Sequence, residues 1–368
     1  MDPYEIQVDA CRGRQQRLLA VMQERDIPLT IITQIAHVQW LTGPRFRDTF
    51  ATAVVLRADG HLTLFAPAKQ PPVAAADEII VFEAKSHSTM RSDQMAKCAD
   101  QVLAVLEAAG RPTRIGCEFS SFPPHLSIPL AAELIDVEPE IYRMRRHKDP
   151  DELAMLQKAI DATGEMFARA REIVVPGVNE LDVFNELQAV AVREFCEPLT
   201  GTGNDYASGV RGGPPRDRLA EDGELYILDL GPAFRGYNGD ACRTLAVGGN
   251  PTDKQLRAAE QCSKIFPHVE ATVRPGKSCQ ELFEEAQAIL DECLPWKFNH
   301  HLGHGIGLSP HEGPHPNPNW DEVFEEGDVF TIEPGLYHED LRGGVRLEND
   351  YLVTADGVRL LSDFPLEL

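Results

Sequence analysis

The chain has 368 residues, of which 43% are hydrophobic and 25% are charged. At roughly 150 residues per domain this length indicates two domains, and the composition excludes a disordered or fibrous protein. Lysine and arginine number 35 against 58 aspartates and glutamates, so the formal charge is −23. Such a surface repels nucleic acid, and we expect a cation or a small substrate in a local pocket instead.

The cysteines exclude two further classes of protein. Eight are scattered along the chain without a C-x-x-C pair, which fits neither a disulfide framework nor a zinc ribbon. Reduced thiols, and therefore a cytoplasmic protein, are expected. The N-terminus lacks the apolar core of a signal peptide, and nowhere do eighteen apolar residues run together, so no membrane association is expected.

The first 140 or so residues alternate helical and strand patterns. Apolar positions Leu18, Leu19 and Met22 predict a helix, and the segments LTIIT and WLTG that follow predict strands. TAVVLRADGHLTLFAP predicts a hairpin that turns at Asp59-Gly60. The segments EIIVFEA and RIGCEFS predict strands on either side of a helix over 94–108. Together these elements predict an α/β domain with a mixed sheet.

A junction follows this domain. Asp149-Pro150 is a helix start, and the residues after it form a long amphipathic pattern. The boundary is therefore expected near residue 147, which divides the chain into domains 1–147 and 148–368.

The second part contains a repeat. Residues 174–190 and 272–289 match at a constant offset of 99, each with a Pro-Gly turn before an amphipathic helix. Residues 221–231 then match 325–335, and Asp229 falls on Glu333. Chance similarity of turn residues is the alternative. A true duplication predicts a pseudo-twofold domain in which acidic residues meet at the centre.

Five of the twelve histidines fall within sixteen residues: His300, His301, His304, His311 and His315. This density indicates a metal or acid/base site, and a flexible surface loop is the alternative. Glycines at 303, 305 and 307 allow the backbone to approach closely whatever the imidazoles hold.

Four carboxylates complete the set of candidate ligands. Asp229 ends an apolar strand and Asp240 follows eleven residues later, so a hairpin would place them side by side. Glu333 ends the matching strand, and Glu348 lies inside a predicted last strand, where a salt bridge to Arg346 is the structural alternative. Two buried carboxylates repel each other unless a cation lies between them. Oxygen-rich ligation with one imidazole suits manganese, iron, cobalt or zinc, and bridging carboxylates suit two metals.

These motifs resemble those of the pita-bread metallopeptidases, which include prolidase, aminopeptidase P and creatinase. The resemblance rests on Asp229, Asp240, His304 in GHGIG, Glu333 in TIEPG and Glu348 in GVRLEND. It implies a creatinase-type N-terminal α/β domain followed by an α+β pita-bread domain with pseudo-twofold duplication. Methionine aminopeptidase lacks the N-terminal domain and is therefore a less similar relative.

The resemblance also implies roles for individual residues. Two divalent ions (Mn, Co, Zn or Fe) bridged by a hydroxide would be held by Asp229, Asp240, His304, Glu333 and Glu348, with Asp240 and Glu348 as the bridging ligands. Glu333 would accept the proton of the nucleophile. His311 would bind the scissile carbonyl, His300 would line the pocket near a proline ring, and Arg346 would steady the site or hold a substrate carboxylate. A homodimer is implied as well.

One family feature is missing. Members of the family place a further histidine 17 or 18 residues before the first aspartate, which corresponds to Arg211 or Gly212 here, and no histidine occurs between His147 and His268. We predict that Arg211 or Arg216 reaches the pocket and presents a cation to substrate. An arginine that points into solvent is the alternative.

The expected activity is that of an Xaa-Pro dipeptidase or aminopeptidase, in which a metal-bound hydroxide attacks an amide next to proline. Two alternatives stay open. One is a hydrolase or lyase of the same fold that acts on a small non-peptide molecule. The other is a metal-binding protein that has lost catalysis together with the missing histidine.

Overall fold

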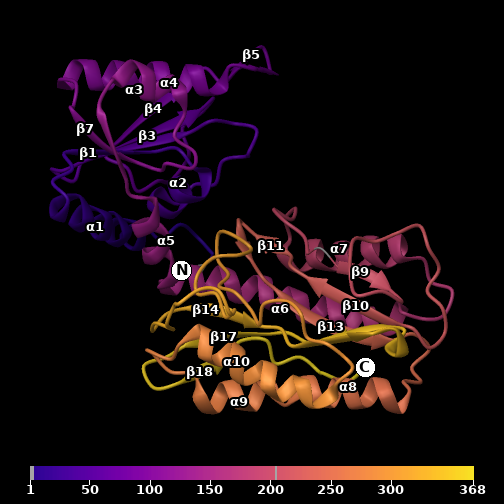
Figure 1. Ribbon diagram of the computed structural model, residues 1–368. Helices are drawn as coiled ribbons and strands as arrows, with labels where there is room; N and C mark the ends of the chain where they lie inside the picture. Colours follow the sequence, from indigo (N-terminus) through magenta and orange to yellow (C-terminus); the bar gives the residue numbers. More distant parts are fainter. Residues whose placement is uncertain (1–3, 204) are drawn as a thin grey trace. The chain divides into compact units, whose positions relative to one another are not determined.

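The computed structural model describes residues 4–203 and 205–368. The chain divides into two compact units, residues 1–145 and 146–368 (Figure 1). The break lies two residues before the boundary expected from the sequence. Among the described residues, no helix combines the length and the apolar character needed to cross a membrane.

The N-terminal unit is built on one six-stranded mixed sheet, in the order β4-β3-β2-β1-β7-β8. The strands β1, β2 and β3 pair antiparallel, whereas β4, β7 and β8 join in parallel. The elements are α1 (Val8–Glu24), β1 (Leu29–Ile32), α2 (Ile35–Thr42), β2 (Ala53–Arg57), β3 (Leu62–Pro67), β4 (Glu78–Phe82), β5 (Lys85–Ser86), β6 (Thr89–Met90), α3 (Gln94–Ala109), β7 (Arg114–Cys117), α4 (Pro124–Leu130), β8 (Glu133–Asp136) and α5 (Glu138–Arg146). The predicted α/β layer with a mixed sheet is confirmed.

The main core of this unit lies between the sheet and two helices. Ile31, Val55 and Phe65 from the strands pack with Val102 of α3 and Leu126 of α4. The predicted hairpin is also confirmed, because β2 and β3 pair on either side of Asp59-Gly60.

The prediction of a strand at WLTG is wrong, because this segment ends helix α2. His37 to Trp40 alternate polar and apolar side chains as a strand would, but residues 37–42 of the helix are all buried, the polar ones included. Gly43 ends the helix with a φ of 97°, and its N–H donates to the carbonyl of Gln39. A glycine in this conformation is a common helix C-terminus.

The second unit consists of two similar halves. The first contains α6 (Pro150–Ile173), α7 (Glu180–Phe195), β9 (Asp205–Ser208), β10 (Leu225–Leu230), β11 (Ala233–Phe234), β12 (Tyr237–Asn238) and β13 (Ala241–Ala246). The second contains α8 (Asp253–Ser263), α9 (Ile265–Thr272), α10 (Cys279–Leu290), the 3₁₀ turn η1 (Asp291–Cys293), β14 (Val329–Ile332), β15 (Gly335–His338), the 3₁₀ turn η2 (Glu339–Leu341), β16 (Gly343–Arg346), β17 (Asn349–Val353) and β18 (Val358–Leu360). Each half has its own apolar core, one around α6 and α7 and the other around α8, α9 and α10.

The helix starts confirm the duplication. Asn179 caps α7 and Ser278 caps α10, and each side chain accepts a hydrogen bond from the first turn of its helix. Each cap follows a Pro-Gly turn, in which Gly177 and Gly276 have φ values of 87° and 91°. An L-residue would be strained in this left-handed conformation, so the repeated glycine has a backbone reason.

The strands repeat in the same way. In the first half β10 pairs antiparallel with β13, and in the second half β14 pairs antiparallel with β17. Asp229 lies near the end of β10, and Glu333 directly follows β14. Glu348, however, does not lie inside a last strand. It occupies the short connection between β16 and β17, and β18 follows.

Candidate metal centre

The carboxylates occupy equivalent positions in the two halves. Asp229 and Glu333 stand at the end of the first strand of each pair, and Asp240 and Glu348 directly precede the second strand. All four line one cavity of about 250 Å³, together with His304. The remaining lining residues are Thr202, Gly203, Asp205, Arg211, Gly231, Asn238, Gly239, His300, His301, Pro310, His311 and Arg346.

The five candidate ligands are close to one another. His304 Nε2 is 3.6 Å from Asp240 Oδ2 and 3.5 Å from Glu333 Oε1. One ligand atom each from Asp240, His304 and Glu348 lies within 4.8 Å of the others. The carboxyl groups of Asp229 and Asp240 interact directly, as the hairpin prediction required. The cavity therefore brings together five donor groups that the sequence separates by up to 119 positions.

The electrostatics of the cavity favour a cation. Burial, followed by the negative charge of neighbouring carboxylates, raises the pKa of Asp240 and of Glu348 well above its usual range. Burial also raises the pKa of Asp229 to about 6, even though the Arg346 guanidinium opposes this change. In addition, Glu348 Oε2 is buried without a hydrogen-bond partner among the described residues. A crowded set of carboxylates with a free oxygen fits divalent metal ions, whose charge would keep all of them ionised.

The orientation of the His304 ring suits a metal ligand. Its Nδ1 lies 3.1 Å from the carbonyl of Gly305, which leaves Nε2 directed at Asp240 and Glu333. Burial lowers the pKa of His304 to about 4, so the ring is neutral at pH 7. A neutral imidazole held by its other nitrogen is the usual state of a metal ligand.

The glycines around His304 allow close packing against other backbone segments, and not against a group held by the imidazoles as expected. A Cβ on Gly303 would lie 1.9 Å from the carbonyl oxygen of Thr331, and a Cβ on Gly305 would lie 2.0 Å from that of Gly313. The loop therefore approaches the backbone of β14 and of residue 313 rather than the imidazole rings. This close packing places His304 beside Glu333.

The backbone of Glu348 is fixed from behind the cavity. Its N–H donates to the carbonyl of Cys242, and Arg243 Nη1 donates to the carbonyls of Cys242 and Glu348. Arg243 is fully buried. It therefore ties β13 to the residue that precedes β17.

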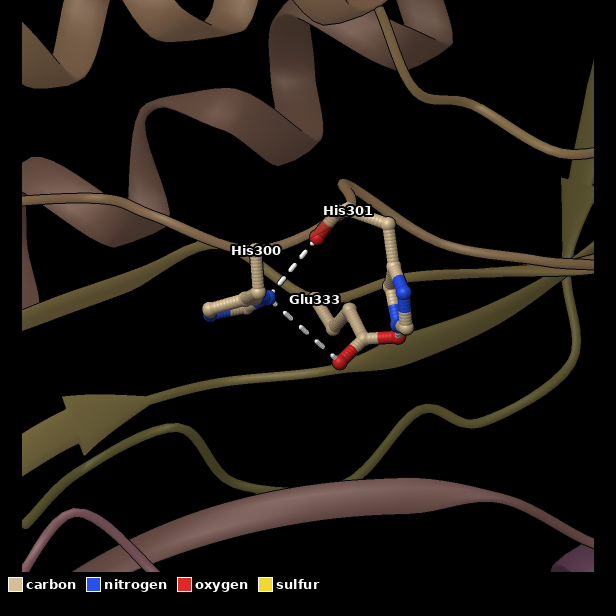
Figure 2. Close-up of side chains that lie close together, drawn as sticks. All are labelled: His300, His301 and Glu333. Carbon is tan, nitrogen blue, oxygen red and sulfur yellow. Dashed lines mark hydrogen bonds and ion pairs between the residues drawn. The ribbon is translucent and has the colours of Figure 1, made fainter. Parts of the chain in front are cut away.

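His300, His301 and Glu333 form a second group of adjacent side chains (Figure 2), and all three line the cavity. His301 Nε2 is 2.8 Å from Glu333 Oε1, and His300 Nδ1 is 2.8 Å from the backbone oxygen of His301. His300 Nε2 is 2.9 Å from the hydroxyl of Tyr337. Burial opposes ionisation of Glu333, but the hydrogen bond from His301 holds its pKa below the usual value. His301 was one of the clustered histidines, and the structure identifies it as the direct partner of Glu333.

His311 lies beside the ligands, and its ring stacks on that of His304 at a centroid distance of 3.6 Å. His315, the last residue of the histidine cluster, does not line the cavity. Its Nδ1 lies 3.0 Å from Glu322 instead. Four of the five clustered histidines therefore belong to the site.

Arg346 does not form the salt bridge to Glu348 that the sequence left open; it binds two aspartates instead. Its Nη2 donates to Asp229 Oδ2 at 2.8 Å and also to Asp205. No sequence motif marks Asp205, because it meets this site only when β9 pairs with β10 and places it opposite Asp229.

The two arginines considered in place of the missing histidine differ. Arg211 lines the cavity, and its guanidinium carbon is 4.5 Å from the ring centroid of Tyr337. Arg216 instead binds Glu180, to which it donates through Nε and Nη2. Of these two arginines, Arg211 lines the cavity and Arg216 does not.

Two family models match the chain. The model of the Creatinase/Prolidase N-terminal domain covers residues 14–147, and that of metallopeptidase family M24 covers residues 154–355. The Xaa-Pro dipeptidase of Pyrococcus horikoshii is 28% identical over 370 residues, which is 98% of this chain and 100% of that protein. The Xaa-Pro dipeptidase of Pyrococcus furiosus is 31% identical over 240 residues, or 64% of this chain and 68% of that protein.

Solved structures share the fold over almost the whole chain. The Xaa-Pro dipeptidase from Bacillus anthracis has a TM-score of 0.83 at 23% identity, covering 97% of this chain and 100% of that one. The prolidase from Pyrococcus furiosus has a TM-score of 0.79 at 24% identity, covering 94% and 99%. The pita-bread fold with a creatinase-type N-terminal domain is thereby confirmed. Because its family model matches more than half of the residues, the chain belongs to metallopeptidase family M24.

Proposed function

We propose that this protein is a metal-dependent peptidase that hydrolyses the amide bond before proline in short peptides. The observation that carries the proposal is the convergence of Asp229, Asp240, His304, Glu333 and Glu348 in one cavity that also contains His300, His311 and Arg211. Full-length similarity to an Xaa-Pro dipeptidase supports the choice of substrate.

The five ligands would hold two divalent ions, either Mn, Co, Zn or Fe. Asp229, Asp240, Glu333 and Glu348 would supply carboxylate oxygens to them, and His304 would supply one imidazole nitrogen. Such ions lower the pKa of bound water and polarise a carbonyl group. The donor set is rich in oxygen and has one imidazole, which suits these metals.

Side chains of this protein would accept a proton from water and orient the substrate. Glu333 would accept a proton from the attacking water, since its carboxylate is held ionised by the hydrogen bond from His301. His311 would donate to the scissile carbonyl from its position against His304. His300, locked between Tyr337 and the backbone of residue 301, would form the wall against the proline ring.

Two arginines have separate roles in the proposal. Arg346 is engaged with Asp205 and Asp229, so it would steady a metal ligand. The Arg211 side chain has no ion pair among the described residues and is exposed at the cavity. It would bind the C-terminal carboxylate of a dipeptide, which a guanidinium can hold with two hydrogen bonds.

A cytoplasmic homodimer completes the proposal. All eight cysteines are free thiols, which suits a reducing compartment. Light scattering tests the assembly: a mass of about twice the 40.8 kDa of one chain is expected, and a mass equal to one chain would contradict the dimer.

Hydrolysis of matched dipeptides tests the activity. The protein is loaded with Mn²⁺ and given Ala-Pro or Ala-Ala, with and without a chelator, and Asp240→Asn serves as the control variant. Metal-dependent cleavage that favours Ala-Pro and is lost in Asp240→Asn supports the proposal. If the protein binds Mn²⁺ but cleaves neither dipeptide, the proposed peptidase activity is wrong.

A further inference from the structure

A second and larger cavity lies within the N-terminal unit. Its volume is about 700 Å³, and it is lined by the loop after α2, the loop after β3, and two single residues, Ile6 and Lys85. Cavities of this size accept small organic molecules. None of the residues placed at the metal centre belongs to it.

The charged residues in the lining of this cavity are all cations: Arg45, Arg47, Lys69 and Lys85. The chain as a whole carries 58 acidic and 35 basic residues, so a lining without a carboxylate departs from its composition. Arg45 is 3.8 Å from Asp48, whose side chain is 81% exposed. In the part of the chain that the structure describes, the side chains of Arg47 and Lys69 have no ion pair. The cavity therefore has positive charge that the protein itself does not neutralise.

The rest of the lining is mainly apolar. Phe46, Phe50 and Val73 contribute side chains, together with four prolines. The Nζ of Lys85 lies 5.3 Å from the ring centroid of Phe50, so an ammonium group stands directly beside an aromatic surface. Val73 leaves 45% of its surface exposed. A ligand that complements this lining carries both a negative charge and an apolar body.

Backbone contacts hold the walls in place. Gly43, at the start of the first loop, packs so closely on Ile6 that a Cβ would lie 2.4 Å from that side chain. In the second loop, Ala68 N–H donates to the carbonyl of Phe82 and Ala75 N–H donates to that of Thr42. The second loop is therefore tied to β4 at its start and to α2 at its end.

We propose that this cavity binds a small organic anion, namely a carboxylate or a phosphate ester with an apolar body. Arg47 and Lys69 would bind the anionic group, and Phe46, Phe50 and Val73 would cover the apolar part. Burying the apolar part supplies affinity, and charge-assisted hydrogen bonds select the anion.

Fluorescence titration with 8-anilinonaphthalene-1-sulfonate tests the proposal, since this probe combines an anion with aromatic rings. Saturable binding to the native full-length chain is expected. Arg47→Gln with Lys69→Gln should weaken it at least about tenfold. The matched control, Arg57→Gln with Lys97→Gln, makes the same charge change outside the cavity and should bind like the original protein. Arg211→Gln should also bind normally, which excludes the metal centre as the binding site.

Competition then identifies the anion. Displacement by octanoate but not by naphthyl phosphate assigns a carboxylate, and the reverse result assigns a phosphate ester. The proposal is wrong if the probe does not bind, if the control weakens binding as much as the cavity variant, or if inorganic phosphate displaces the probe as well as the organic anions do. Circular dichroism of every variant establishes that it is folded.

Discussion

Lys148 and Glu312 form a buried ion pair beside the candidate metal centre, with Lys148 Nζ 2.7 Å from Glu312 Oε1. Their side chains are 1% and 2% exposed. Glu312 directly follows His311, and its backbone pairs with that of Gly305, which directly follows His304. A Cβ on Gly307 would also strike the Glu312 carboxylate. This pair therefore anchors the segment that stacks His311 on His304.

Lys148→Met should destabilise the protein by about 3–5 kcal/mol, because it leaves the Glu312 charge buried without a partner. Urea unfolding measures this loss. The double variant Lys148→Met with Glu312→Met should recover much of the stability, since an apolar pair replaces the ion pair. A single variant as stable as the original protein would contradict a structural role for the pair.

Arg211→Gln should raise KM for Ala-Pro about tenfold, because the guanidinium no longer holds the substrate carboxylate, and should change kcat much less. Ala-Pro amide lacks that carboxylate, so its steady-state constants should respond little. Arg216→Gln, which removes the arginine bound to Glu180, is the matched control. Equal effects on the acid and the amide would show that Arg211 does not bind the carboxylate.

Glu348→Gln should remove the stabilisation that Mn²⁺ provides. At a Mn²⁺ concentration of 100 times Kd, the free energy of unfolding of the original protein should rise by about 2.7 kcal/mol. In the absence of metal the variant should be at least as stable as the original, because one of the crowded carboxylates has lost its charge. Calorimetric titration and urea unfolding measure both effects.

Glu322→Gln provides the control for this experiment, since Glu322 pairs with His315 outside the cavity. It should respond to Mn²⁺ like the original protein. If Glu348→Gln also responds fully, Glu348 is not a metal ligand.

The N-terminal unit should lose stability in acid because of His37. The ring is fully buried, with Nδ1 3.0 Å from Glu118 Oε1. Burial lowers the pKa of His37 even though Glu118 opposes the change. The unfolded chain then binds the proton more tightly, so this stability is present above about pH 6.5 and is lost as the pH falls below it, by at most about 1.4 kcal/mol per pH unit.

Native-state hydrogen exchange of the β1 amides measures this loss between pH 7.5 and 5.5. His37→Gln should show a smaller change in opening free energy over that interval, and His87→Gln, an exposed histidine, should match the original protein. An unaltered pH response in His37→Gln would assign the effect to other groups.

Helix α2, which ends before Gly43, shows one limit of predicting secondary structure from the sequence. Residues 37 to 40 alternate polar and apolar side chains, which is the pattern of a strand, whereas in the helix all residues from 37 to 42 are buried, the polar ones included. The amphipathic helices α7 and α10 were predictable for the opposite reason, because each follows a Pro-Gly turn and has one apolar face.

The sequence by itself determined the duplicated architecture, the family and the five candidate ligands, because each depends on short motifs whose spacing along the chain is visible. Only the tertiary structure decided which side chains partner them. Arg346 lies two residues from Glu348 but binds Asp205 and Asp229, and Arg211 rather than Arg216 reaches the cavity. His301 pairs with Glu333 although 32 positions separate them. The physical reason is that a hydrogen bond depends on distance in space, and strand pairing sets that distance independently of separation in sequence.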